Sequence, residues 1–247
     1  MDESVRRRQG RSFGSVADVY ERSRPGYPEA AVRWLVGTDG PARVVDLAAG
    51  TGRLTEQLVN LGHFVVAVEP SAQMIDKLTR RIRRGVAAVQ ANAEAIPLRT
   101  ARSDALVVGQ AFHWFDTGPA LHEIARVVKT GGMFGLVWNI RDESVPWVRR
   151  LSTILSTGGD NSEGLVEAVD DSRLFRDIEV AEFRLWQQLD KDSLLALASS
   201  RSYVATLPPG DRQEILAKVG RLYDVTARQP DGLVMPYKTM CYRAEVR

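Results

Sequence analysis

The stretch from Val44 to Thr55 constrains the fold of this chain more than any other, because a strand, a tight loop and a helix follow one another within it. Arg43 to Leu47 is a short run rich in β-branched residues, which predicts a buried strand. Ala48 to Gly52 carries small residues, so the backbone can turn tightly and a ligand can lie against it. From Leu54 to Gly62 the apolar spacing is helical. The unit would present free N–H groups at a helix N-terminus to a ligand.

Two classes of ligand suit this loop. A dinucleotide site requires a third glycine where Thr55 stands, although Gly50 and Gly52 are present. Asp46 lies at the carboxyl end of the predicted strand, and its carboxylate suits an amine or hydroxyl donor better than a pyrophosphate. An ordinary turn whose glycines serve the backbone geometry alone is the third interpretation.

Composition limits the classes of protein that remain. The 247 residues fit one large α/β domain or a core with an appendage, with 44% apolar and 26% charged residues. The net charge of +2 gives no strong attraction to nucleic acid. The single cysteine, Cys241, excludes a disulfide framework and a cysteine-rich zinc site. No apolar run reaches bilayer length, so we expect no membrane partner. The single cysteine suits a reducing cytoplasm. We also expect a monomer or homodimer that binds neither a metal nor nucleic acid.

A second apolar strand, His63 to Val68, ends at Glu69 and Pro70. Glu69 follows the glycine loop at close to the spacing expected of a carboxylate that binds ribose hydroxyls. A carboxylate suits a vicinal diol because it can accept two hydrogen bonds at once. The alternative is a solvated charge at the end of a strand.

Two further strands carry candidate residues at their carboxyl ends. Val86 to Gln90 leads to Asn92, whose amide can both donate to and accept from an adenine. Ser103 to Val108 leads to His113 and Trp114. The unperturbed pKa of a histidine suits proton acceptance near neutrality, so His113 is a candidate base. Trp114 could lie against a cation or line the substrate pocket. The alternative is a histidine packed among aromatic side chains.

The remaining elements complete an alternating pattern. A helix from Pro119 to Val128 and a strand from Met133 to Ile140 continue the βαβ order of a parallel sheet. Residues 141–175 and 190–228 are mainly helical, and 176–189 and 232–246 alternate as closing strands. Before the first strand, Tyr20 and Tyr27 could form a lid over a ligand, or belong to a helix packed on the sheet.

The series Asp46-x-x-x-Gly50-x-Gly52, followed by Glu69, resembles motif I of the class I S-adenosylmethionine-dependent methyltransferases. The resemblance favours the small-molecule branch of methyltransferase type 11 and trans-aconitate methyltransferase-like proteins. It implies an α/β, Rossmann-like, seven-stranded and mostly parallel sheet with helices on both faces and an antiparallel last strand. We expect a single domain over 1–247 with a cofactor-binding core at 13–140, and the position of the helices after strand five predicts that they form a cap.

The resemblance further implies S-adenosylmethionine as donor and S-adenosylhomocysteine as product. The cofactor-binding positions that it implies are Asp46, Ala48, Gly50, Gly52, Glu69, Pro70, Asn92, Ala93, Glu94 and Gln110. Asn92 stands where the family usually has aspartate. His113 would be the catalytic residue, and Tyr20, Tyr27 and Trp114 would form the lid or contact the substrate.

The predicted activity is methyl transfer to oxygen or carbon of a small molecule, a carboxylate among the candidates, by in-line displacement. No Asn/Asp-Pro-Pro-aromatic tetrad follows the fourth strand, which argues against amino groups of DNA bases and glutamines as acceptors. Two other functions stay open: an NAD(P)-binding oxidoreductase, and a non-catalytic binding protein with a methyltransferase fold.

Overall fold

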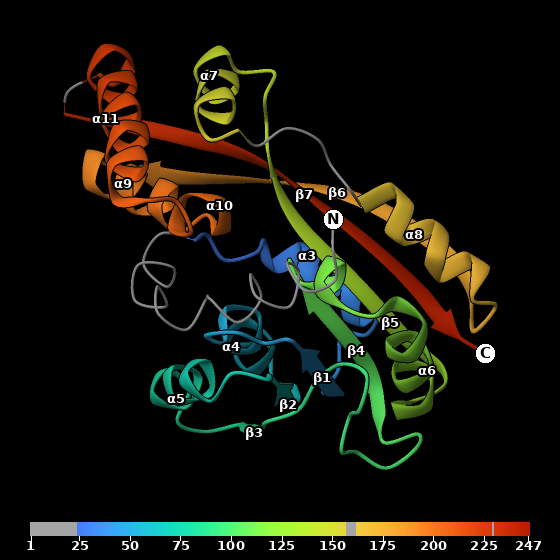
Figure 1. Ribbon diagram of the computed structural model, residues 1–247. Coiled ribbons are helices and arrows are strands. Elements are labelled where there is room, and N and C mark those ends of the chain that lie inside the picture. Colours follow the sequence, from blue (N-terminus) through green and yellow to red (C-terminus); the bar gives the residue numbers. More distant parts are fainter. Residues whose placement is uncertain (1–23, 157–161, 229) are drawn as a thin grey trace. The chain divides into compact units, whose positions relative to one another are not determined.

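The computed structural model describes residues 24–156, 162–228 and 230–247 (Figure 1). Its helices are α3 (Glu29–Val36), α4 (Arg53–Asn60), α5 (Ala72–Arg81), the 3-10 helix η2 (Phe112–Trp114), α6 (Thr117–Val127), α7 (Pro146–Ile154), α8 (Ser162–Asp171), α9 (Lys191–Ser199), α10 (Ser202–Ala205) and α11 (Pro209–Thr226). Its strands are β1 (Arg43–Leu47), β2 (Phe64–Val68), β3 (Val86–Val89), β4 (Ser103–Gly109), β5 (Val128–Arg141), β6 (Phe175–Leu189) and β7 (Leu233–Val246).

The strands form one seven-stranded sheet in the order β3-β2-β1-β4-β5-β7-β6 (Figure 1). The first five strands pair in parallel, and β7 is antiparallel. Strand order reverses between β1 and β4, and ligands of open α/β sheets bind beyond the carboxyl ends of the strands at such a point. The predicted fold class, a Rossmann-like mixed sheet with an antiparallel last strand, is confirmed.

Contacts divide the chain into two compact units, which we describe separately. Of the described residues, the sheet unit comprises 26–139, 162–183 and 239–247. The helical unit comprises residues 24–25, 140–156, 184–228 and 230–238. That the chain forms a single domain with a helical cap stays a prediction.

The core of the sheet unit lies around β4, which is buried on both faces. Ala105 and Val107 belong to a buried apolar cluster with residues of α3 and α4 such as Leu35 and Leu58. The next residue along, Leu106, points to the other face and is equally buried. A strand covered on both faces is typical of a parallel sheet in an α/β protein. This burial explains why residues 105–108 of β4 are all apolar.

In the helical unit, α7, α9 and α11 bury their apolar faces together. Leu151, Leu194 and Val219 are fully buried in one cluster with Met235 of β7. Helix α9 begins at Lys191, where the Asp190 carboxylate caps it by accepting a hydrogen bond of 2.8 Å from Ser193 N.

Strand β5 begins earlier than the sequence predicts, at Val128 instead of Met133. Glycines commonly end a helix, but Gly131 and Gly132 are part of β5, where the register against β4 shifts between Ser103 and Ala105. A Cβ at Gly132 would lie 2.6 Å from Val128 Cγ1 and 2.7 Å from the Asp104 carbonyl oxygen. Glycine is required here because the two backbones approach closely.

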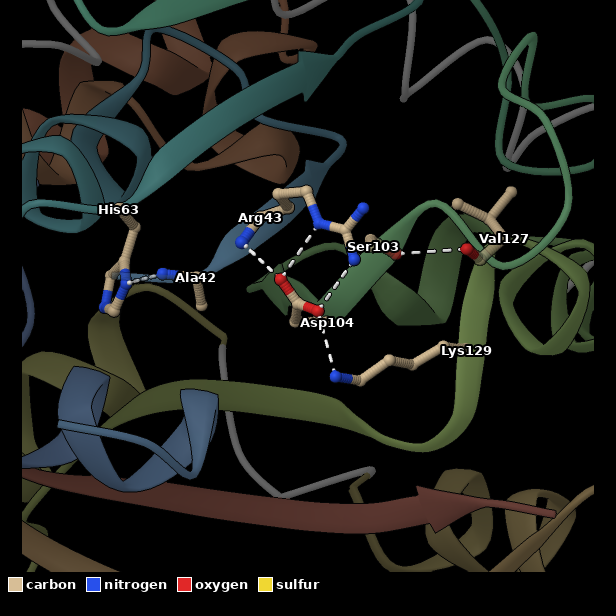
Figure 2. A network of polar contacts seen from close by, with 7 residues as sticks. All are labelled: Ala42, Arg43, His63, Ser103, Asp104, Val127 and Lys129. Carbon is tan, nitrogen blue, oxygen red and sulfur yellow. Dashed lines mark hydrogen bonds and ion pairs between the residues drawn. The ribbon is translucent and has the colours of Figure 1, made fainter. Parts of the chain in front are cut away.

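Hydrogen bonds and ion pairs between charged residues connect the amino ends of the central strands (Figure 2). The Asp104 carboxylate accepts hydrogen bonds from Arg43 N at 2.8 Å and from the Arg43 guanidinium at 3.0 and 3.1 Å. Lys129 Nζ lies 3.0 Å from the same carboxylate. In the same view, His63 Nδ1 accepts a hydrogen bond of 3.2 Å from Ala42 N. This edge is opposite the carboxyl ends of the strands, so the network supports the sheet and leaves the ligand edge clear.

Candidate functional site

The strand order places the predicted site residues along one edge of the sheet unit. Parallel pairing sets Leu47 beside Val68 and Val68 beside Val89, so three chain segments leave the sheet next to one another. Asp46 pairs with Val107 of β4 on the other side. The loops after β3, β2, β1 and β4 therefore follow one another in that order (Figure 1).

The loop between β1 and α4 turns through three residues in the left-handed region. Ala48, Gly50 and Gly52 have φ angles of 59°, 58° and 85°. A Cβ at Gly52 would lie 2.8 Å from Leu78 Cγ, so glycine allows α5 to pack against the turn. A Cβ at Gly50 would meet no atom within 4 Å. The open space at Gly50 fits a ligand that lies against the backbone of this loop.

Glu69 connects this loop to the end of β2. Its Oε2 accepts a hydrogen bond of 3.0 Å from Gly50 N, and its Oε1 accepts one of 2.9 Å from Ser71 N. The side chain is buried, and this burial raises the pKa of the carboxyl against the opposing effect of the two N–H donors. Each carboxylate oxygen can accept a second hydrogen bond. The carboxylate is therefore held in a defined orientation with acceptor capacity left for a diol.

Asp46 lies under the loop and is fully buried. Burial raises the pKa of its carboxyl to about 7, and the charge of Glu69 adds to the rise. The Thr55 hydroxyl donates a hydrogen bond of 2.5 Å to Asp46 Oδ2, and this bond opposes the rise of the Asp46 pKa. Thr55 stands where a dinucleotide fingerprint has its third glycine, and here its hydroxyl is the hydrogen-bond donor to the buried Asp46 carboxylate.

The segment after β3 is anchored to the segments around α6. Glu94 Oε1 accepts a hydrogen bond of 2.9 Å from Asp116 N, and Ile96 N donates to Glu123 Oε2 at 2.7 Å. Ala93 is buried, and the Asn92 carbonyl accepts from Ala95 N at 3.2 Å. The Glu94 carboxylate therefore has a structural partner in this structure. The adenine role of Asn92 and Ala93 stays a prediction.

The segment after β4 carries the remaining candidates. Gln110 has a φ of 60°, and its backbone N–H donates to the Val137 carbonyl at 2.9 Å. His113 and Trp114 lie in η2, with ring centroids 4.6 Å apart and planes at 46°. Both side chains are half-buried, so each can reach a ligand at this edge.

Tyr27 is held at the same edge by two residues that the sequence did not single out, Gln57 and Asn139. Gln57 Oε1 accepts from Tyr27 N at 3.0 Å, and Gln57 Nε2 donates to the Tyr27 carbonyl. Asn139 Nδ2 donates to the Gly26 carbonyl at 2.9 Å. A Cβ at Gly109 would lie 2.6 Å from the Tyr27 hydroxyl oxygen, so the phenol reaches the carboxyl end of β4.

Two of the predicted positions, Pro70 and Tyr20, contribute less to the description of the site. Pro70 follows Glu69, and its carbonyl accepts a hydrogen bond of 3.0 Å from Gln90 Nε2. Tyr20 lies outside the described residues.

Across the described ranges, no helix is long and apolar enough to cross a membrane. In those same ranges, no group of three or more His, Cys, Asp or Glu side chains could hold a metal ion.

A glycine turn, a buried acid beneath it and a second acid after the next strand, on a sheet of this order, define a class I S-adenosylmethionine-dependent methyltransferase. The chain belongs to the methyltransferase type 11 family of that class. Residues 45–136 match the family model described as "Methyltransferase domain". It is an enzyme, and S-adenosylmethionine is its cofactor.

Comparison with individual proteins agrees with this assignment. An uncharacterized methyltransferase of Mycobacterium tuberculosis is 40% identical over 241 residues, which cover 97% of each chain. The structure of a provisional type II methyltransferase from Anaeromyxobacter dehalogenans superposes with a TM-score of 0.69 at 22% identity, covering 90% of this chain and 97% of that one. Phosphoethanolamine N-methyltransferase 2 of Haemonchus contortus, solved with S-adenosylhomocysteine, has a TM-score of 0.54 at 16% identity, with coverage of 88% and 51%.

Proposed function

We propose that this enzyme transfers the methyl group of S-adenosylmethionine to an oxygen or carbon atom of a small molecule, with carboxylates among the candidate acceptors. The observation that carries the proposal is the Glu69 carboxylate, held by the N–H groups of Gly50 and Ser71 beside the open space at Gly50. This arrangement offers one ligand both a hydrogen-bond acceptor for its diol and a backbone surface that it can lie against.

Each cofactor contact is assigned to a group on this edge. Glu69 would accept the two ribose hydroxyls with the lone pairs that its N–H partners leave. Asn92 and the backbone of Ala93 would contact the adenine. The turn from Ala48 to Gly52, with Asp46 beneath it, would hold the methionine part. Pro70, Glu94 and Gln110 complete the set through their loops.

The cofactor supplies a methyl group that is activated by its bond to a positively charged sulfur. The rest of the cofactor is a good leaving group because it departs as a neutral thioether. The enzyme's main contribution is then alignment and exclusion of water, which supply up to about 7–11 kcal/mol in well-oriented reactions. A carboxylate acceptor has no proton to lose, so it requires no general base. A phenol or carbon acid does, and half-buried His113 in η2 is the residue assigned to that role.

Aromatic residues at this edge would enclose the acceptor. The Tyr27 phenol lies against Gly109, and Trp114 packs on His113. An aromatic ring stabilises a cation that lies over its face, so Trp114 suits the neighbourhood of a sulfonium. Tyr20 is assigned to the same lid on its sequence position alone.

The two other functions are less well supported. An oxidoreductase would bind a pyrophosphate at the glycine turn, yet Asp46 places a carboxylate directly beneath that turn. A non-catalytic binding protein need not maintain Asp46, Gly50, Gly52 and Glu69 together. Cytoplasmic location, a monomeric or homodimeric state and the trans-aconitate methyltransferase-like branch stay predictions.

The proposal is tested by measuring S-adenosylhomocysteine formation with separate pools of carboxylic acids, phenols, carbon acids and amines. We expect turnover with at least one oxygen or carbon acceptor pool. His113→Ala should leave turnover of a carboxylate unchanged within about threefold and slow a phenol by about 10²–10⁴-fold, the usual range for general base catalysis. Turnover confined to amines would overturn the proposed acceptor class.

A further inference from the structure

The segment before α3 is held by the side chain of one residue of α4. Tyr27 lies between Gly26 and Pro28 in no helix or strand, so its backbone N–H and carbonyl cannot pair within a regular element. Gln57 Oε1 accepts a hydrogen bond of 3.0 Å from Tyr27 N, and Gln57 Nε2 donates to the Tyr27 carbonyl. One half-buried amide thus pairs with both backbone groups of a residue 30 positions earlier in the chain.

Asn139 of β5 holds the preceding residue. Its Nδ2 donates a hydrogen bond of 2.9 Å to the Gly26 carbonyl. Its Oδ1 accepts one of 2.6 Å from the hydroxyl of Thr239, which is fully buried in β7. Because the bond to β7 engages the acceptor end of the amide, the donor end is directed at Gly26.

The same asparagine connects this segment to the loop after β4. Gln110 Nε2 donates to the Asn139 carbonyl at 3.4 Å, and Gln110 N donates to the Val137 carbonyl at 2.9 Å. Gln110 is one of the predicted cofactor-binding positions. Asn139 therefore joins two segments of the ligand edge that are distant in sequence, one before α3 and one after β4.

These bonds determine where the Tyr27 ring lies. A Cβ at Gly109 would be 2.6 Å from the Tyr27 hydroxyl oxygen and 3.2 Å from Tyr27 Cζ. The phenol therefore occupies the space that a side chain at Gly109, the last residue of β4, would fill. Because strand order reverses between β1 and β4, this position adjoins the place where ligands bind in such sheets.

We propose that Gln57 and Asn139 are positioning residues for cofactor binding, which hold the Tyr27 ring against S-adenosylmethionine at the carboxyl end of β4. A ring that is fixed before the ligand arrives loses little conformational entropy on binding. The two amides therefore raise the affinity without touching the cofactor. The inference rests on the proposed function in one respect: the cofactor is taken to bind at this edge.

Calorimetric titration with S-adenosylhomocysteine in a double-mutant cycle tests the inference. Gln57→Met keeps the length of the side chain and removes both bonds to Tyr27. We expect it to weaken binding about tenfold in the wild-type background, the scale of one or two neutral hydrogen bonds. In Tyr27→Ala, which has no ring to position, the same substitution should weaken binding less than about twofold. Asn139→Ala should follow the same pattern.

An equal loss of affinity in both backgrounds would overturn the inference, because Gln57 would then act without the Tyr27 ring. Unchanged affinity in a folded Gln57→Met variant would overturn it too. Urea unfolding of each variant separates stability from affinity, since Gln57→Met should lower the stability alike in both backgrounds. Gln57→Glu keeps the acceptor for Tyr27 N, so it should recover part of the affinity and serves if Gln57→Met does not fold.

Gln213→Met is the matched control, because Gln213 is an exposed residue of α11. It should bind S-adenosylhomocysteine as the wild type does. A loss equal to that of Gln57→Met would show that the effect does not depend on contact with Tyr27.

Amide hydrogen exchange of the cofactor-free protein separates this inference from the proposed function. The Tyr27 N–H should exchange about tenfold faster in Gln57→Met than in the wild type. Faster exchange in a protein that binds no S-adenosylhomocysteine would refute the proposed function and the inference that rests on it. Cofactor affinity unaffected by both Tyr27→Ala and Gln57→Met would refute the inference alone and leave the methyltransferase proposal intact.

Discussion

The hydroxyl of Thr55 donates a 2.5 Å hydrogen bond to Oδ2 of Asp46, and both side chains are buried. Asp46 is the second-last residue of β1 and Thr55 lies in the first turn of α4, so the bond joins the two elements that flank the glycine turn. The carboxyl beneath the turn is thereby oriented before any ligand arrives.

Asp46 should make the stability of the protein fall as the pH rises from about 4 to 7. Its pKa is about 7 in the folded protein and about 3.9 in an unfolded chain, so the folded state binds more protons in that range. Its contribution is fully present below the unfolded pKa and is lost as the pH rises through the folded pKa. The loss is of the order of 4 kcal/mol before other groups are counted. Urea unfolding at several pH values measures it.

Asp46→Asn should remove this part of the pH dependence. The variant keeps an acceptor for Thr55 but cannot ionise, so its free energy of unfolding should change less between pH 4 and 7 than that of the wild type. A residual slope of the same sign is expected from Glu69, whose pKa is also raised by burial. Parallel pH profiles for wild type and variant would contradict the assignment.

Gly109→Ala should destabilise the protein by about 1–3 kcal/mol, the usual cost of overpacking. The new methyl group would lie 2.6 Å from the Tyr27 hydroxyl oxygen and 3.3 Å from Leu54 Cδ2. Gly118→Ala is the matched control, because a Cβ there meets no atom within 4 Å and alanine favours the helix α6. Adding Tyr27→Phe to Gly109→Ala should recover part of the loss. Equal midpoints in thermal unfolding for the two alanine variants would show that Tyr27 does not occupy this position.

Asp104→Asn should cost about 1 kcal/mol at neutral pH, a modest amount because its partner Arg43 is half exposed. Arg43 holds the pKa of the Asp104 carboxyl well below its usual range. A group with a lowered folded pKa stabilises above its unfolded pKa and loses that contribution as the pH falls. The difference between wild type and variant should therefore shrink below about pH 4. A difference that persists undiminished at pH 2 would show that Asp104 acts through its shape and not its charge.

Local signals were sufficient for much of the fold. The strand at Arg43–Leu47 and the sheet with an antiparallel last strand follow from periodicity and from the resemblance, and the structure has them. The early start of β5 was missed because Gly131 and Gly132 normally end a helix. Their tertiary role, close approach to β4, has no local signature.

The site was predictable where a residue follows a strand directly. Glu69 and the glycine turn are of this kind, and their hydrogen bond joins them at the sheet edge. Gln57 and Asn139 act instead through backbone groups of Gly26 and Tyr27, distant in sequence, so no spacing reveals them. Long-range side chain to backbone bonds of this kind require the folded structure.

The central claim is that Glu69 binds the ribose of S-adenosylmethionine, and calorimetric titration with S-adenosylhomocysteine tests it most directly. Wild-type protein should bind this product and not NADH. Glu69→Ala should bind it about 10–150-fold more weakly, since a hydrogen bond to a charged group contributes about 1.5–3 kcal/mol. Exposed Glu182 offers the control substitution Glu182→Ala, which should bind as the wild type does. Unchanged affinity in a folded Glu69→Ala variant, or binding of NADH alone, would contradict the account.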